Sequence, residues 1–202
     1  MRCNFKRYLT AFLSIQKDFS VQASATWQWV YQPTDGKLVI ELDDTLQHHS
    51  PYKESRLARL CSMRAAFDLE DAEVYQAIHD ALNDADFSPM VAISAGLNAA
   101  ILNRFGRPQM PQSWYFQQND QSTPASKFSV GELGLINSGF AVSPVITLVG
   151  DSEFAECMVL APQLQVSEIK SLHQFDTVKV LHNRIQPLSA AAVTAFPELK
   201  RA

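Results

Sequence analysis

The stretch SPMVAISAGLNAAILNRFG, residues 88–106, is the part of the sequence that most strongly determines the fold. Ser88 is a good helix N-cap, Pro89 suits the first helical position, and Gly106 follows the end of the pattern. Large apolar residues recur at helical spacing, and alanine fills much of the remaining circumference. A helix that is apolar almost all round is buried. The stretch therefore predicts a helix that the rest of the protein covers.

A second helix is predicted just before it, over residues 68–86. Tyr75, Ile78 and Leu82 recur at helical spacing. Asp68 is a suitable N-cap, and the acidic residues that follow it suit the positive end of the helix dipole. We interpret this acidic stretch as a helix start and a solvated face, with a catalytic carboxylate pair as the alternative.

A β-hairpin is predicted at the N-terminal side of these helices. Residues 27–31 alternate and are aromatic, residues 33–36 contain the turn dipeptide Asp-Gly, and residues 37–42 form the second strand. Alternation places three residues of the second strand on one face: Leu38, Ile40 and Leu42.

An aromatic strand is predicted at residues 113–118, after a rigid Met-Pro link. Alternation would turn Trp114 and Phe116 toward the core and Tyr115 outward. The same region could instead border an apolar pocket together with Ile40 and Tyr75. Both alternatives, plain core and pocket, are compatible with the sequence.

The C-terminal half is predicted to be a small antiparallel sheet or barrel. A polar stretch at residues 119–127 separates it from the helices. Short β-branched or alternating segments predict five strands, at residues 128–136, 145–149, 153–160, 163–166 and 177–185.

The predicted fold class is therefore α+β. An N-terminal α/β domain holds the hairpin, the aromatic strand and the two main helices, and a C-terminal domain is an antiparallel, twisted, β-barrel-like sheet. The two domains are predicted to span residues 26–118 and 119–189. Residues 1–25 are predicted to be an N-terminal extension that is dispensable for the fold. Residues 190–202 are predicted to be a tail, which begins with a possible helical turn over 190–196.

Composition excludes several functional classes. The 202 residues carry a net charge of −4, which argues against a broad basic surface for nucleic acid. The seven glycines form neither a dinucleotide-binding nor a phosphate-binding loop. The N-terminal apolar run is short and is followed by charged residues, so export with cleavage near residue 25 is only an alternative. No stretch of the sequence predicts a membrane-spanning segment.

Catalytic and metal-binding motifs are not found in the sequence. Adjacent His48 and His49 would face opposite sides of a strand and could not share a metal. A dyad of Cys157 with His173 or His182 stays open, although no local pattern supports it. We therefore expect no catalytic residue, no metal and no cofactor.

Four segments, taken in order, resemble the ZapC family of cell-division proteins. The decapeptide RPQMPQSWYF at residues 107–116 is the most specific. The others are the aromatic residues of 27–31, the LEDA stretch at 69–72 and DTVKVLHNRIQP at 176–187. The resemblance covers about residues 27–188, and Gln112 stands where the family commonly has lysine.

The resemblance implies a cytoplasmic, non-enzymatic protein at the midcell division ring. Members of the family bind the filament protein FtsZ, promote lateral bundling of its filaments, stabilise the ring and slow GTP turnover. Bundling needs two contacts per unit, from two surfaces of one chain or from a dimer, and we favour the monomer. The alternatives are a small-ligand-binding protein or enzyme with a pocket between the two domains, or an exported β-rich protein.

Five residues are predicted to bind the partner. Arg107 and Arg184 lie in the two best-matched segments and are expected to be exposed, Arg184 on a strand. For each, a solvated charge or a cap on a backbone carbonyl is the alternative. The three apolar candidates are Ile40, Tyr75 and Trp114.

Overall fold

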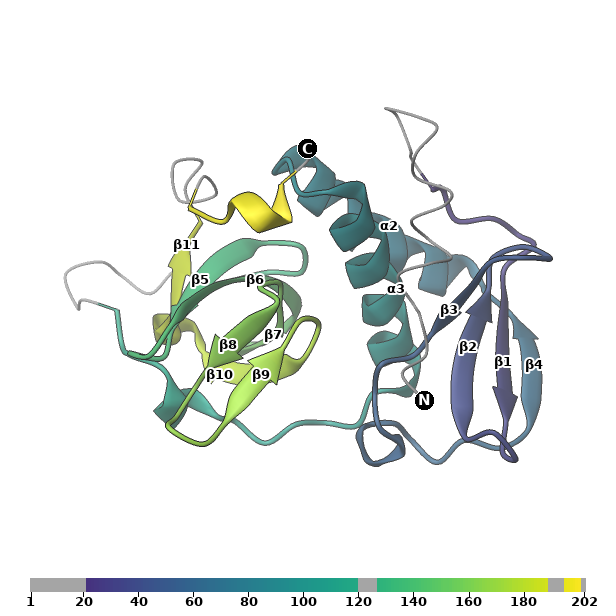
Figure 1. Cartoon of the computed structure of the whole chain (residues 1–202), viewed down its shortest axis with the longest axis horizontal. Coiled ribbons are helices and arrows are strands. Elements are labelled where there is room, and N and C mark those ends of the chain that lie inside the picture. Colours follow the sequence, from purple (N-terminus) through teal and green to yellow (C-terminus); the bar gives the residue numbers. More distant parts are fainter. Residues whose placement is uncertain (1–20, 120–126, 189–194, 201–202) are drawn as a thin grey trace.

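The computed structural model describes residues 21–119, 127–188 and 195–200. Within these residues, two α-helices lie between two antiparallel sheets (Figure 1). The sheet on one side comes from the N-terminal part of the chain, and the sheet on the other side from the C-terminal part. This arrangement confirms the predicted α+β class.

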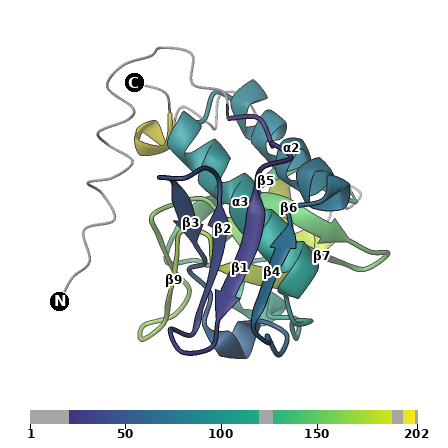
Figure 2. The same ribbon diagram turned by 90° about the vertical axis from the view of Figure 1, so that its right-hand side faces the viewer.

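The N-terminal sheet has the strand order β3-β2-β1-β4, and all of its pairings are antiparallel. Figure 2 views it with the helices behind. The predicted hairpin is confirmed, and Gly36 in its turn has a positive φ of 59°. The strands are β1 (Gln28–Gln32), β2 (Lys37–Glu41), β3 (Gln47–His49) and β4 (Met63–Ala66).

Both predicted helices are confirmed, and they are α2 (Leu69–Asp84) and α3 (Pro89–Phe105). Asp68 and Asp71 form a capping box at the start of α2, because each carboxylate accepts the backbone N–H of the other residue. The Ser88 hydroxyl caps α3 in the same way. The helices pack tightly at Gly96, where a Cβ atom would lie 2.8 Å from the Tyr75 ring.

The C-terminal sheet has the order β10-β7-β6-β5-β11. Its edge strands are consecutive in the chain and are joined by the 3₁₀ turn η3 (His182–Arg184), so the sheet curls until its edges approach. This curl gives the barrel-like form that the sequence predicts. The strands are β5 (Leu133–Asn137), β6 (Val142–Gly150), β7 (Phe154–Val159), β10 (Thr177–Leu181) and β11 (Ile185–Pro187), with the separate pair β8 (Gln163–Gln165) and β9 (Ser171–His173).

The helix α3 contributes to two cores on opposite faces. One face packs against the N-terminal sheet through Ile93, Leu97 and Ile101. The other face packs against the C-terminal sheet through Ala95, Ala99 and Leu102, which share a core with Ile146 and Met158. A third core lies within the C-terminal sheet. The two halves of the protein are therefore joined by a common core.

Both ends of the described chain pack against the helices. Val21 and Ala23 contact the N-terminal core, and the Val21 carbonyl accepts the Tyr75 hydroxyl at 2.6 Å. Leu199, in the turn η4 (Pro197–Leu199), is 2% exposed, and its carbonyl accepts the Ser88 N–H at 2.7 Å. Residues 21–25 and 197–200 are thus part of the packed structure, whereas most of the predicted turn over 190–196 lies outside the described residues.

Several predicted elements differ from the structure. Residues 113–118 do not form a strand but begin with the 3₁₀ turn η2 (Ser113–Tyr115). The strand predicted over 177–185 is interrupted by η3, which holds Arg184. The strands β3, β4 and β9 were not expected, because three or four residues are too few to show periodicity.

The buried His48 makes stability depend on pH. Its Nε2 donates to Asn98 Oδ1 at 2.9 Å, and burial lowers its pKa from 6.5 to about 4. Between pH 6.5 and about 4, His48 is protonated in the unfolded chain but not in the folded chain. The free energy of unfolding therefore falls as the pH falls through this window. Lowering the pH from 7 to 5 is expected to cost about 2 kcal/mol through His48. Urea denaturation of the wild type and His48→Gln measures the difference, and equal pH slopes would contradict the assignment.

Truncation tests the packing of residues 21–25. A chain that begins at Ser20 is expected to keep its thermal midpoint. A chain that begins at Ala25 loses the acceptor of Tyr75 and the apolar contacts of Val21, so its midpoint is expected to fall by about 4 °C or more. Equal midpoints for both chains would show that this packing does not contribute to stability.

Candidate partner-binding surface

A connector, residues 107–116, runs from the end of α3 to the C-terminal sheet. At its start the Arg107 N–H donates to the Arg56 carbonyl at 2.9 Å, and Arg56 Nη1 donates back to the Arg107 carbonyl at 3.0 Å. Further along, the Gln112 N–H donates to the Lys179 carbonyl of β10 at 2.7 Å. The connector is thus fixed by backbone hydrogen bonds to both halves of the protein.

A polar cluster beneath the connector joins three parts of the chain. Arg56 Nη2 lies 2.6 Å from Thr177 Oγ1 and 3.5 Å from Glu156 Oε1. Gln109 donates to the same two side chains, with 3.1 Å to Glu156 Oε1. Because Arg56 belongs to η1 (Glu54–Arg56) and Glu156 to β7, these bonds hold the connector at the boundary of the two halves.

The outer side of the connector carries exposed apolar residues. Met110 is 80% exposed and Trp114 is 71% exposed. Tyr115 is half-buried, and Lys170 Nζ lies 4.4 Å from the centre of its ring. Among these apolar residues of the connector, only Phe116 turns inward, at 3% exposure. The prediction that Trp114 faces the core is wrong, because alternation does not apply in a 3₁₀ turn.

The two predicted arginines lie at opposite ends of the connector. Arg107 is exposed, and its side chain has no hydrogen bond or ion pair with any described residue. Arg184 is half-buried, and its Nη1 donates to the Phe116 carbonyl at 3.2 Å. Arg184 is therefore a carbonyl cap, as the alternative interpretation had it, whereas Arg107 is free to meet a partner.

Ile40 and Tyr75 lie elsewhere. Both are fully buried in the N-terminal core, where Tyr75 stacks on His79 and contacts Trp27 edge-on. The structure brings these two residues together but leaves Trp114 on the surface. It favours plain core over an open pocket for Ile40 and Tyr75.

Sequence reasoning missed Met110 and Lys170 as members of this surface. Prolines on both sides of Met110 could have indicated an exposed extended segment. Lys170 lies in the β8–β9 turn, and its Nζ donates to Gln112 Oε1 at 3.2 Å. No local sequence pattern predicts this contact. The neighbouring Ile169 is 98% exposed. The turn and the connector thus form one surface with apolar and basic side chains.

The Cys157–His182 alternative is not supported by the geometry. Cys157 is fully buried, and burial raises its pKa to about 12. His182 Nδ1 accepts the Phe128 N–H and its Nε2 donates to the Asp151 carbonyl, so both nitrogens are occupied. His173, the other candidate, is exposed. A buried neutral thiol of this kind is a poor nucleophile.

The described residues contain neither a cluster suited to a metal ion nor a helix suited to a membrane. No group of three or more histidine, cysteine, aspartate or glutamate side chains is arranged to hold a metal ion there. In the same residues, each helix is too short or too polar to cross a membrane.

The chain is similar to known cell-division proteins over most of its length. The family model described as "Cell-division protein ZapC, N-terminal" matches residues 20–107, and "Cell-division protein ZapC, C-terminal" matches residues 108–191. A "Cell division protein ZapC" from Idiomarina loihiensis is 39% identical over 169 residues, 83% of this chain and 90% of the relative. One from Shewanella frigidimarina is 34% identical over 168 residues, 82% and 92% of the two chains. The two matched stretches meet where the connector begins.

Stability measurements separate core residues from surface residues. Ile40→Ala is expected to lower the free energy of unfolding by about 2–5 kcal/mol, because it leaves a cavity beneath the sheet. Trp114→Ala should change it by about 0.5 kcal/mol or less, because the ring is solvent-exposed. Urea denaturation measures both. A large loss for Trp114→Ala would contradict the exposed position.

Proposed function

The chain belongs to the ZapC family of cell-division proteins, and on this premise we propose that it binds the filament protein FtsZ through the connector surface. The observation that carries the proposal is the exposure of Met110 and Trp114 on a segment anchored to both halves. Large apolar side chains held rigidly at a surface lose little entropy on binding and commonly dominate interface energies. The outer face of the connector is therefore suited to a protein partner.

The basic side chains support the same proposal. Arg107 stands at one end of the surface, and Lys170 lies beside Tyr115. Positive charges around an apolar centre favour encounter with an acidic partner surface, and salt weakens that effect over about 8 Å at physiological ionic strength. Arg184 supports the connector through Phe116 and is proposed to position it rather than to contact FtsZ.

The proposed activity is lateral bundling of FtsZ filaments in the cytoplasmic division ring at midcell. FtsZ completes its GTPase site between successive subunits, so a bundling protein can slow GTP turnover without performing chemistry. We propose that the chain itself has no catalytic activity. The two contacts that bundling requires would come from two surfaces of one monomer.

Co-sedimentation with FtsZ and GTP tests the proposal. Trp114→Ala is expected to lower the bound fraction strongly, with an affinity loss of about tenfold or more. Adding Arg107→Glu should lower it further and reduce its dependence on salt. Leu69→Ala is the matched control, because Leu69 is an equally exposed apolar residue, at 75%, that belongs to α2 and not to the connector.

The thermal midpoint of each variant is measured beside its pelleting. Binding that survives in the double variant, with the fold intact, would remove the connector from the site. Phosphate released from GTP by the chain alone would contradict the non-enzymatic proposal.

A further inference from the structure

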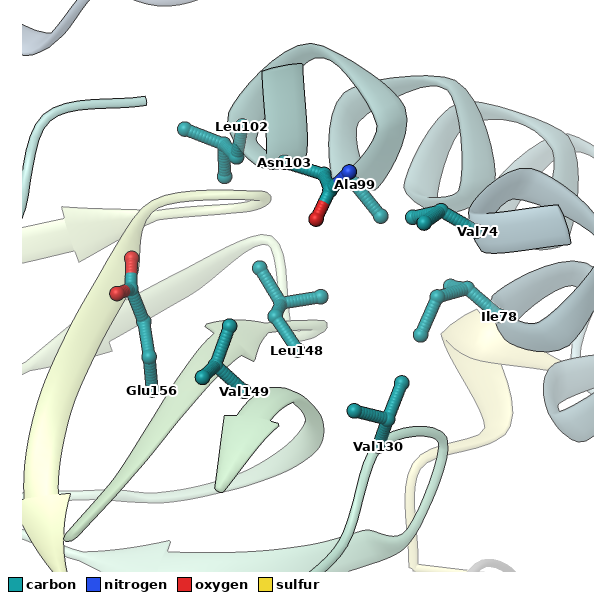
Figure 3. Close-up of a pocket in the computed structure, with 9 residues that line it drawn as sticks. All are labelled: Val74, Ile78, Ala99, Leu102, Asn103, Val130, Leu148, Val149 and Glu156. Atoms are coloured by element: carbon teal, nitrogen blue, oxygen red, sulfur yellow. The ribbon is translucent and has the colours of Figure 1, made fainter. Parts of the chain in front are cut away.

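A small apolar pocket lies where the helices meet the C-terminal sheet (Figure 3). Its volume is about 130 Å³. Helices α2 and α3 form one wall, and the opposite wall comes from β6, β7 and the turn before β5. The lining residues are Val74, Ile78, Ala99, Leu102, Asn103, Val130, Leu148, Val149 and Glu156.

A β-bulge in β6 shapes this wall. Thr147 pairs with Cys157 and Val149 pairs with Glu156, which leaves Leu148 as an extra residue between them. Regular alternation would send Leu148 and Val149 to opposite faces, yet both line the pocket. Bulges redirect side chains in this way and are frequent beside functional sites.

The rim of the pocket is apolar and open to solvent. Val130 is 53% exposed and Val149 is 54% exposed, and both line the pocket. A free small molecule inside the pocket would leave these two side chains in water. A protein surface laid across the rim would cover them, which favours a side chain of a protein partner as the occupant.

The polar atoms at the pocket are hydrogen-bond acceptors. Asn103 Nδ2 donates to Glu70 at 3.3 Å, and a carboxylate only accepts, so the amide oxygen of Asn103 is the atom that faces the pocket (Figure 3). Glu156 Oε1 accepts from Arg56 and Gln109, and Oε2 has no hydrogen-bond partner in the described part of the chain. The pocket therefore offers acceptors that a donor on the occupant would match.

The charge of Glu156 is already matched by Arg56, whose Nη2 lies 3.5 Å away. A lysine of a partner would lose hydration and face this second cation, and a carboxylate would face two acceptors. A neutral donor fits best. For size, a cavity of about 150 Å³ holds one benzene ring, so the pocket suits a single six-membered ring rather than an indole.

We propose that this pocket receives a tyrosine side chain of a protein partner. The ring lies between α3 and the bulged strand, and the hydroxyl donates to Asn103 Oδ1 or Glu156 Oε2. The partner's backbone then covers Val130 and Val149. This assignment is independent of the connector surface and of FtsZ as the partner.

Titration of the full ¹⁵N-labelled chain followed by NMR tests the assignment. N-acetyl-tyrosine amide is expected to shift the amide signals of the lining residues and to bind about three- to tenfold more tightly than N-acetyl-phenylalanine amide, which lacks the donor. Free phenol should bind more weakly than the tyrosine amide, because it cannot cover the valine rim.

Two variants make the test specific. Asn103→Leu should reduce the preference for tyrosine over phenylalanine, and Ala99→Met should fill the pocket and abolish binding of both. Glu73→Gln is the matched control, because Glu73 is exposed on α2 and is not among the residues that line the pocket. Thermal midpoints verify that each variant is folded. If Ala99→Met does not fold, the test rests on the preference for tyrosine over phenylalanine in Asn103→Leu, because Asn103 is exposed and its replacement leaves the core unchanged.

Three results would overturn the proposal. Equal binding of the tyrosine and phenylalanine amides would exclude recognition of the hydroxyl. Phenol that binds as tightly as the tyrosine amide would assign the pocket to free small molecules. Shifts that are absent or lie outside the lining residues would show that the pocket does not bind such a ring.

Discussion

The two opposite faces of α3 are buried by different sheets, and the rest of the structure depends on this constraint. Ile93 and Leu97 pack toward the N-terminal sheet, while Ala95 and Ala99 allow the C-terminal sheet to approach. A helix enclosed in this way needs small residues on at least one side, since two bulky faces would force the sheets apart. The alanine-rich composition of α3 therefore fixes the three-layer arrangement.

Local signals predicted the helices and the hairpin, because caps and turn residues act within a few positions. Asp68, Ser88 and Gly36 all have the roles that their residue types suggest. The connector could not be predicted in this way. Its conformation depends on Lys179 and Glu156, which lie far along the chain, so the orientation of Trp114 followed from tertiary contacts rather than from alternation.

The connector motif contains both residues that support the fold and residues that are exposed at the surface. Gln109 points inward and joins Glu156 to the cluster around Arg56, whereas Met110 and Trp114 point outward. The prolines on either side of Met110 restrict the backbone between these roles. The motif was recognisable in the sequence, but the division between its supporting and exposed residues required the structure.

The shared core has a consequence for biosynthesis. Every buried residue of the N-terminal core lies between Trp27 and Phe105, so this core can close once α3 has left the ribosome. The second face of α3 stays uncovered until Ile146, Met158 and finally Leu199, near the end of the chain, have been synthesised. Ala92, Ala95 and Ala99 expose less apolar area on this face than larger side chains would, which limits aggregation before the C-terminal sheet has been synthesised.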